Sequence, residues 1–272
     1  MIKGLLHIAV CVSLLGAPMA LCAQDLVVTV EGGQIEGTVD EEGVVVYKGI
    51  PYAAPPVNEL RWKQPQPVQS WQGVKKCDKF GAASLQGGQT KGSFYWKEFY
   101  QDGNPEMSED CLYLNVWTPE VGKKDNRLPV MVWIHGGAFQ NGFGHEIEFD
   151  GDAYAKKGVV LVTLNYRLGM GGFLAHPLLT AENGGKGSGN YGLFDQLAAL
   201  KWVKRNIEAF GGDPNNVTVF GQSAGAGSVQ ALISSPLAEG YIQRAIIQSG
   251  GGLGGIISTK SCLLYTSPSP RD

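Results

Sequence analysis

One stretch decides the fold of this chain, and it reads Phe220-Gly221-Gln222-Ser223-Ala224-Gly225-Ala226. It sets a G-x-S-x-G pattern between the β-branched run at residues 217–219 and a run of small residues that can begin a helix. This order predicts a sharp strand-to-helix turn that lifts the Ser223 hydroxyl above a sheet. The two glycines are expected where a β-carbon would clash, and the helix N-terminus beneath the serine favours negative charge nearby. Ser223 is therefore the candidate nucleophile.

A second motif supplies what such a serine needs. The apolar run at residues 128–134 predicts a buried strand that leads into His135-Gly136-Gly137-Ala138-Phe139. A turn of this type after a central strand donates backbone N–H groups to an oxyanion, because small residues let the backbone approach a substrate. A further donor is the N–H of Ala224, directly after the serine. The alternative is a glycine turn with a purely structural role.

Further motifs carry a family resemblance: YKGIPYA at 47–53, LRW at 60–62, EDCLYLNVW at 109–117, HGGAF at 135–139, NYRLG at 165–169, GNYGLFDQ at 189–196, FGGDP at 210–214 and GQSAG at 221–225. With them, residues 26–255 resemble the N-terminal half of a type-B carboxylesterase, the family that includes cholinesterases and bacterial para-nitrobenzyl esterases. The resemblance implies an α/β-hydrolase fold, with a mostly parallel central sheet flanked by helices. It also implies that Ser223 is the nucleophile. The implied oxyanion donors are Gly137, Ala138 and Ala224, with Gly136 serving the turn.

The rest of the catalytic triad is not found in this chain. In α/β-hydrolases an acid and then a histidine follow the nucleophile in sequence. No histidine follows Ser223, and Glu239 comes too soon after it to be assigned as the acid. His135 belongs to the oxyanion turn, and we expect His145 and His176 in surface or loop positions. We therefore expect a fragment whose C-terminal part, with the triad acid and histidine, is missing, and which is inactive as it stands.

The last residues depart from the preceding pattern. CLLYTSPSPRD at 262–272 has no hydrophobic period, and it can be read back as a transposase adapter used in sequencing libraries. We expect residues 261–272 to be a non-native, adapter-derived tail, which leaves the hydrolase domain at residues 24–260. A genuine polar tail that contains prolines is the alternative.

Residues 1–23 have the pattern of a secretory signal peptide. Lys3 gives a short basic start, residues 4–15 form the apolar core, and Ala23 is a suitable last residue before cleavage. The apolar run is too short to span a bilayer comfortably, although an uncleaved anchor is the alternative. We expect an exported protein, periplasmic or secreted, without a stable membrane span after cleavage.

Two cysteines remain once both ends are set aside, Cys77 and Cys111. Two cysteines in an exported protein favour a disulfide, and the family resemblance places a disulfide-closed loop that ends at Cys111. Closing a loop of about 35 residues contributes about 3.8 kcal/mol in the chain-entropy model. Two buried free thiols are the alternative.

The composition is that of a globular enzyme. Hydrophobic residues make up 43% of the chain and charged residues 17%, which suits a buried core and excludes a disordered chain. The net charge of −3 is too small to favour nucleic acid as a partner. The sequence has no phosphate-binding glycine loop and no paired Cys or His spacing of a metal site. We therefore expect neither a cofactor nor a metal.

The pattern of elements is rich in strands first and then alternates between strands and helices, which implies a mostly parallel sheet. Residues 191–210 have apolar side chains at helical spacing and are followed by Gly211, a suitable helix stop. Residues 244–248 are expected to form an uncovered apolar edge. Strands are expected at residues 26–30, 34–39, 44–48, 111–118, 128–134, 159–166, 217–220 and 244–248, and a second helix at about 224–234.

These observations predict a hydrolase of small-molecule carboxylic esters that acts through a serine nucleophile and an acyl-enzyme. Cholinesterases carry a choline-stacking tryptophan where this chain has Gln101, and a glutamate where it has Gln222, and both differences argue against a quaternary ammonium substrate. Aromatic residues at 94–96 and 99–100 either line a substrate pocket or pack beneath the loop. A non-catalytic binding or adhesion protein of the same fold is the alternative function.

Overall fold

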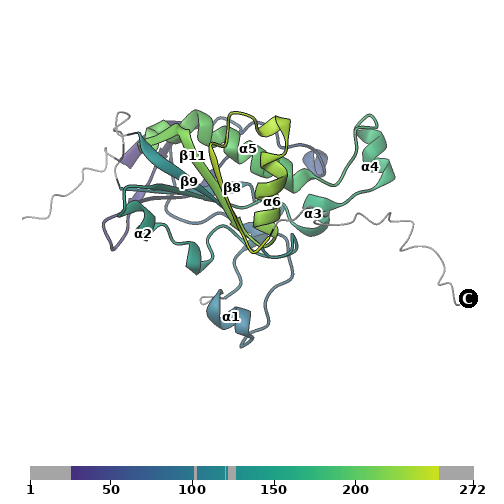
Figure 1. Cartoon of the computed structure of the whole chain (residues 1–272), viewed down its shortest axis with the longest axis horizontal. Helices are drawn as coiled ribbons and strands as arrows, with labels where there is room; N and C mark the ends of the chain where they lie inside the picture. Colours follow the sequence, from purple (N-terminus) through teal and green to yellow (C-terminus); the bar gives the residue numbers. More distant parts are fainter. Residues whose placement is uncertain (1–25, 101–102, 120, 122–126, 251–272) are drawn as a thin grey trace, which may run out of the picture.

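The computed structural model describes residues 26–100, 103–119, 121 and 127–250 (Figure 1). The predicted signal peptide at residues 1–23 and the predicted adapter-derived tail at 261–272 lie outside these described residues, as does Gln101.

A seven-stranded sheet forms the centre of the described chain, in the order β12-β11-β9-β10-β8-β4-β3. The first four strands of that order run parallel to one another, whereas β8 pairs antiparallel with β10, β4 with β8 and β3 with β4. Strands β1, β2 and β5 form a smaller sheet, and β6 and β7 form a two-stranded ribbon. The bounds are β1 Val27–Val30, β2 Gly33–Glu36, β3 Thr38–Val39, β4 Val45–Pro51, β5 Val74–Lys76, β6 Ala83–Ser84, β7 Met107–Ser108, β8 Tyr113–Thr118, β9 Leu128–Ile134, β10 Val160–Leu164, β11 Gly212–Gln222 and β12 Arg244–Gln248.

Helices cover both faces of this sheet (Figure 1). Side chains of α5 and α6 pack with Val132 and Val219 on one face, and Ala155 of α2 packs with Trp133 and Phe220 on the other. The helices are α1 Phe94–Glu98, α2 Asp152–Ala155, α3 Gly169–Phe173, α4 Pro177–Glu182, α5 Tyr191–Asn206 and α6 Ala224–Ile233, with short 3₁₀ turns at η2 Asn58–Leu60, η3 Ile147–Phe149, η4 Ile207–Phe210 and η5 Pro236–Ala238. The layered arrangement of strands and helices agrees with the sequence pattern.

Strands β9 and β10 run through the middle of the core. All five residues of β10 are buried, as expected for a strand that is covered on both faces. Along β9, successive side chains join opposite faces, because side chains alternate along a strand: Val130, Val132 and Ile134 join one core cluster and Trp133 joins the other. Both faces of the sheet therefore exclude water beneath the site that β9 leads to.

The long helix predicted at residues 191–210 is present, but its last four residues form a 3₁₀ turn and not an α-helix. Helix α5 ends at Asn206, and η4 continues the chain to Phe210 as a tighter 3₁₀ turn. Gly211 then adopts a left-handed φ of 80°, which fits the predicted glycine stop.

One predicted strand divides in two. Residues 34–39 were expected to form a single strand, but β2 belongs to the small sheet and β3 to the edge of the large one. Gly37 lies at the break, where a β-carbon would come 2.8 Å from the Tyr47 ring. The chain therefore passes from one sheet to another at a position that only glycine fits.

The predicted disulfide is wrong for this structure, in which Cys77 and Cys111 are buried free thiols. The carbonyl of Cys77 accepts a hydrogen bond from the Lys48 N–H of β4, while Leu112, next to Cys111, accepts from Tyr52 just beyond the same strand. The Leu112 contact continues the β4–β8 pairing, and the Cys77 contact adjoins a bridge from Lys48 to Asp78. Strand β4 thus separates the cysteines by about two strand spacings, roughly 9–10 Å, beyond the reach of a disulfide.

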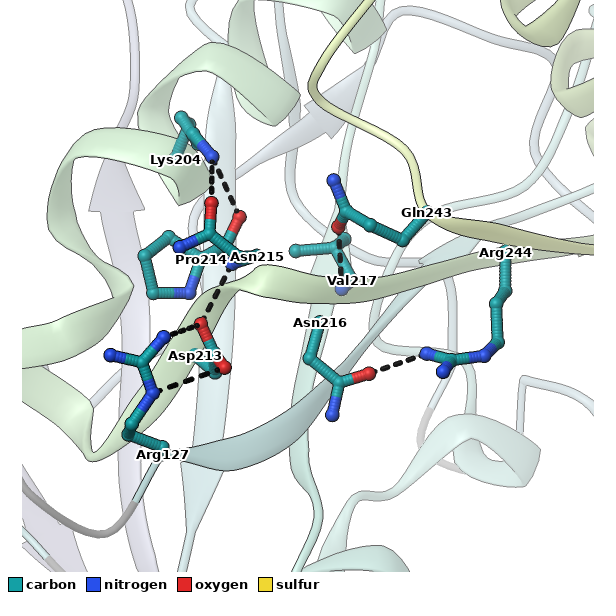
Figure 2. A network of polar contacts seen from close by, with 9 residues as sticks. All are labelled: Arg127, Lys204, Asp213, Pro214, Asn215, Asn216, Val217, Gln243 and Arg244. Carbon is teal, nitrogen blue, oxygen red and sulfur yellow. Dashed lines mark hydrogen bonds and ion pairs between the residues drawn. The ribbon is translucent and has the colours of Figure 1, made fainter.

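Polar contacts fix the start of β11, the strand that leads to Ser223 (Figure 2). Arg127 donates two hydrogen bonds to Asp213, at 2.9 and 3.3 Å, and Lys204 of α5 donates to the Pro214 carbonyl at 3.1 Å. The Gln243 side chain accepts from the Val217 N–H at 2.8 Å. These contacts tie β11 to the segment before β9, to α5 and to the segment before β12.

Candidate active site

Ser223 lies at the turn between β11 and α6, as predicted. Its φ of 55° and ψ of −119° are unusual for a residue other than glycine, and its side chain is exposed. The Ser223 N–H donates to the Gln248 carbonyl of β12 at 2.9 Å. Strain of this kind persists only where the surroundings enforce it, and it occurs at the residue that the sequence motif singles out.

The two glycines of the motif are required by close backbone contacts. A β-carbon on Gly221 would lie 2.6 Å from the carbonyl carbon of Gly225, and one on Gly225 would lie 2.0 Å from the Ile134 carbonyl oxygen. Real β-carbons do not come this close to backbone atoms. The steric reason predicted for these glycines is therefore the one that the structure shows.

The structure brings the two sequence motifs together. A β-carbon on Gly136 would lie 2.8 Å from the Gln222 carbonyl oxygen and 3.4 Å from the β-carbon of Ser223. The turn that follows β9 is thus in contact with the turn that follows β11. Gly136 is small because the backbone of the serine turn occupies the adjacent space.

The predicted oxyanion donors lie on a turn with left-handed backbone. Gly137, Ala138 and Phe139 have φ values of 97°, 56° and 59°. The Gly137 carbonyl accepts from the N–H groups of Gln140 and Asn141, at 2.9 and 3.0 Å. Within the described part of the chain, the N–H groups of Gly137 and Ala138 donate no hydrogen bond to a protein acceptor.

The third predicted donor is Ala224, the first residue of α6. The first N–H groups of a helix have no acceptor within the helix, and they carry its positive dipole end. Ala224 directly follows the exposed Ser223. Backbone donors from two elements therefore lie in the region of the serine.

His135 is part of the scaffold of this turn. Its ring is buried and stacks on Tyr166 at 4.4 Å, and the Tyr166 hydroxyl donates to the His135 carbonyl at 2.9 Å. Burial lowers the pKa of His135 to about 4, so the ring is neutral at pH 7. Nδ1 lies 2.9 Å from the Gly136 carbonyl oxygen. Since a carbonyl can only accept, the proton of the neutral ring is on Nδ1, which donates this hydrogen bond. The histidine thereby fixes the orientation of the peptide that begins the oxyanion turn.

The other two described histidines are also engaged in local structure. His145 is a loop residue, as expected, but its ring is mostly covered, stacking on Phe80 at 4.4 Å and lying 4.5 Å from Phe143. Burial lowers the pKa of His145 to about 4. His176 lies at the start of α4, where its Nδ1 accepts from the Leu178 N–H at 3.2 Å.

Sequence reasoning missed a buried ion pair beside the site. The Asp195 carboxylate of α5 accepts from Nε, Nη2 and the backbone N–H of Arg167, at 2.8, 2.7 and 3.1 Å. Two residues on, Gly169 donates its N–H to the Phe139 carbonyl of the oxyanion turn at 2.7 Å. The NYRLG and GNYGLFDQ motifs contain both partners, but nothing in either motif shows that they pair.

A second missed pair explains two other motifs. Arg61 donates from Nε and Nη2 to the two carboxylate oxygens of Glu109, at 2.5 and 2.6 Å. These hydrogen bonds hold the pKa of Glu109 below its ordinary value. The LRW and EDCLYLNVW motifs therefore meet in space, although 48 positions separate the two residues.

The aromatic residues at 94–100 differ in burial, and the contacts that they make are those of the predicted packing role. Tyr100 is buried and packs on Phe143 with ring centres 5.0 Å apart. Phe94 and Tyr95 are 67% and 56% exposed, on helix α1, which projects from the body of the molecule (Figure 1). Both rings pack on Phe99, with ring centres 6.0 Å from Phe94 and 5.2 Å from Tyr95, so packing also accounts for part of this exposed pair.

The described residues have neither a metal-ion cluster nor a membrane-crossing helix. No group of three or more His, Cys, Asp or Glu side chains in these ranges is arranged to hold a metal ion. None of the helices in the same ranges combines the length and the apolar character that crossing a bilayer requires.

The fold and the paired turns define a class of protein, and comparison with known families names it. The chain matches the carboxylesterase family over residues 24–266 and belongs to that family. Among its relatives, fumonisin B1 esterase from Sphingopyxis macrogoltabida is 47% identical over 239 residues, which cover 86% of this chain and 42% of the relative. Para-nitrobenzyl esterase from Bacillus subtilis (strain 168) is 49% identical over 225 residues, which cover 82% and 43%.

Solved structures agree with the sequence relatives. A thermophilic PNB esterase superposes with a TM-score of 0.74 at 47% identity, over 83% of this chain and 44% of that structure. This likeness confirms the predicted α/β-hydrolase fold and the resemblance to para-nitrobenzyl esterases. The chain spans less than half the length of the relatives it matches.

Proposed function

We propose that this chain is the nucleophile-bearing part of a carboxylic ester hydrolase in which Ser223 attacks small-molecule esters. The observation that carries the proposal is the contact between the two turns: Gly136 lies against Gln222 and Ser223, and only glycine fits there. Family membership and esterase relatives support ester hydrolysis as the reaction. The strained backbone of Ser223 is the feature expected of a nucleophile held above a sheet.

The proposed mechanism uses backbone groups of this chain for charge stabilisation. A histidine from outside this chain accepts the Ser223 proton as Oγ bonds to the ester carbonyl carbon. The resulting oxyanion accepts hydrogen bonds from Gly137, Ala138 and Ala224, each of which is worth about 2.7–4 kcal/mol in comparable enzymes. The alcohol leaves with the proton from the histidine, and water then hydrolyses the acyl-enzyme.

The 272-residue chain by itself should show no turnover, because no histidine follows Ser223 to act as the base. We also propose that the substrate carries no quaternary ammonium group, since Gln222 is a neutral amide next to the serine. Hydrolysis of choline esters with a kcat/KM as high as that for p-nitrophenyl acetate would contradict this substrate class.

Export is a further part of the proposal. It is supported by the basic start, apolar core and small residues of positions 1–23. N-terminal sequencing of the mature protein should place cleavage after Ala23. A mature protein that retains Met1 would refute the cleavage of residues 1–23 as a signal peptide.

Covalent labelling tests the nucleophile directly. A complete esterase that contains this chain should react with a fluorophosphonate probe and hydrolyse p-nitrophenyl acetate, and Ser223→Ala should abolish both. Ser234→Ala is the matched control, because Ser234 is exposed at the C-terminal end of the same helix. Absence of label from a folded wild-type protein would refute the esterase mechanism and favour a non-catalytic binding role.

A further inference from the structure

The loop after the oxyanion turn packs directly against it at Gly142. This residue has a φ of 105°. A β-carbon on it would lie 2.5 Å from His135 Nδ1 and 2.9 Å from the Gly136 carbonyl oxygen. The position of Gly142 therefore decides how much room His135 and Gly136 have, and the predicted oxyanion donors follow directly after them.

Gln86 holds both backbone groups of Gly142. Its Oε1 accepts from the Gly142 N–H at 2.8 Å, and its Nε2 donates to the Gly142 carbonyl at 2.9 Å. The same Nε2 donates to the Ser84 carbonyl at 3.2 Å, which fixes the amide relative to its own chain. A primary amide is the group that can satisfy a backbone donor and a backbone acceptor at once.

The segment that carries Gln86, just after β6, supports the same loop at a second point. The Asn165 side chain accepts from the Gly144 N–H at 2.7 Å and donates to the Ala82 carbonyl at 2.9 Å. Ser84 Oγ in turn accepts from the Leu168 N–H at 3.0 Å. Gln86 is thus attached to a segment that is fixed to the core and can serve as a rigid point for Gly142.

The oxyanion turn needs such support. Left-handed backbone at Ala138 and Phe139 is strained, and strained residues keep their conformation only when contacts around them enforce it. Within the turn, the Gly137 carbonyl is held by Gln140 and Asn141. At the ends of the turn, Tyr166 and Gly169 hold the carbonyls of His135 and Phe139, and Gly142 packs against His135 and Gly136.

We propose that Gln86 is a positioning residue for ester hydrolysis, which acts by holding Gly142 against His135 and Gly136 so that the N–H groups of Gly137 and Ala138 stay aimed at the oxyanion. The inference rests on the proposed esterase function. Gln86 contacts Gly142 and Ser84 and acts through the turn, so its loss should weaken the transition state more than substrate binding.

The test uses a complete esterase that contains this chain, with p-nitrophenyl butyrate as substrate. Gln86→Ala should lower kcat by about 100-fold, the size that a displacement of about 1 Å can produce, while KM stays within about threefold. Gln66→Ala is the matched control, because the exposed Gln66 amide makes one local bond to the Gln64 carbonyl. This control should keep both kcat and KM.

Gln86→Glu distinguishes positioning from general stability. A carboxylate can accept from the Gly142 N–H but repels the Gly142 carbonyl, whereas the protonated acid can donate to that carbonyl as the amide does. The activity of Gln86→Glu relative to wild type should therefore be highest at low pH and fall as the new carboxyl ionises. A residue needed only for stability would lower the melting temperature without this pH-dependent rescue.

The outcomes separate the two proposals. Ser223-dependent hydrolysis in the wild type with an unchanged kcat in Gln86→Ala refutes the positioning role alone. Equal activity in wild type and Ser223→Ala refutes the esterase function, and the inference with it. If Gln86→Ala does not fold, Gln86→Glu decides: a constant activity ratio to wild type across pH overturns the inference, and a ratio that falls with rising pH supports it.

Discussion

Asp195→Asn should destabilise the protein by about 3–5 kcal/mol, the usual cost of breaking a buried ion pair from one side. The side chains of Arg167 and Asp195 are 5% and 0% exposed. The substitution keeps the shape of the side chain but removes its charge, which leaves the guanidinium buried without a counter-charge. The amide also turns an NH₂ group toward donors that previously met a carboxylate oxygen.

The comparison variant is Asp213→Asn. Arg127 and Asp213 also form a two-bond pair, but their side chains are 58% and 14% exposed. Exposed pairs contribute about 0–1 kcal/mol, because water screens the charges. An asparagine at this position can still accept from the Asn215 N–H as Asp213 does. The two variants therefore differ mainly in the burial of the ion pair.

Urea unfolding followed by circular dichroism measures both variants against wild type. A loss of about 3–5 kcal/mol corresponds to a melting temperature lower by roughly 6–20 °C for a domain of this size. The double variant Arg167→Met, Asp195→Leu should recover part of the loss, since apolar pairs often replace buried ion pairs without cost, but the buried Arg167 N–H loses its acceptor. The reasoning is refuted if Asp195→Asn costs no more than Asp213→Asn, or if the double variant is no more stable than Asp195→Asn.

Two further predictions concern the site and its pH dependence. Gly225→Ala should cost more than about 3 kcal/mol, because its β-carbon would lie 2.0 Å from the Ile134 carbonyl oxygen. Gly171→Ala, in helix α3 with open space at that position, should stabilise by about 0.4–1 kcal/mol in the same unfolding assay. Burial, with a smaller contribution from Glu148, raises the pKa of Glu146 from 4.5 to about 7, which favours the protonated form in the folded state. The stability that this form provides is full below pH 4.5 and is lost as pH rises to about 7, so the advantage of Glu146→Gln over wild type should grow by about 3 kcal/mol across that window. Unfolding titrations of Glu146→Gln and wild type that run parallel from pH 4 to 8 would contradict this.

Strands and helices with a strong local pattern could be predicted from the sequence. The predicted strands at residues 128–134 and 244–248 have the bounds of β9 and β12, because each is an apolar run between clear breaks. Residues 34–39 have the same kind of local pattern but divide between two sheets. The difference lies in the contact of Gly37 with the Tyr47 ring, which is a tertiary contact and leaves no local pattern.

At the candidate site, too, local structure could be predicted from the sequence and tertiary contacts could not. The motif predicted the position of Ser223 at a strand-to-helix turn and the steric reason for Gly221 and Gly225, because such a turn is a local structure. The partners of Asp195 and of Gln86 could not be predicted, since each pairs with a group far away in the sequence. The wrong disulfide has the same origin: the expected export and the family resemblance made Cys77 and Cys111 a plausible pair, and only the sheet pairing shows that β4 lies between them.

The register of two strands explains why the motifs meet. Parallel strands β9 and β11 pair Ile134 with Gly221, so both chains leave the sheet at the same level, and Gly136 and Ser223 each follow two residues later. Carboxyl ends of parallel strands are where such folds place their sites.

That register is enforced by the core beneath the site. Trp133 pairs with Phe220 across the two strands, and both rings pack on the same face with centres 4.9 Å apart. A shift of the β9–β11 register by one residue would move Phe220 to the opposite face of the sheet. The same shift would move Ser223 away from Gly136. The contact of Gly136 with Ser223, which carries the proposed function, is therefore a consequence of core packing on both faces of the sheet. Substitutions at Trp133 or Phe220 should change the geometry of the site although neither side chain belongs to it.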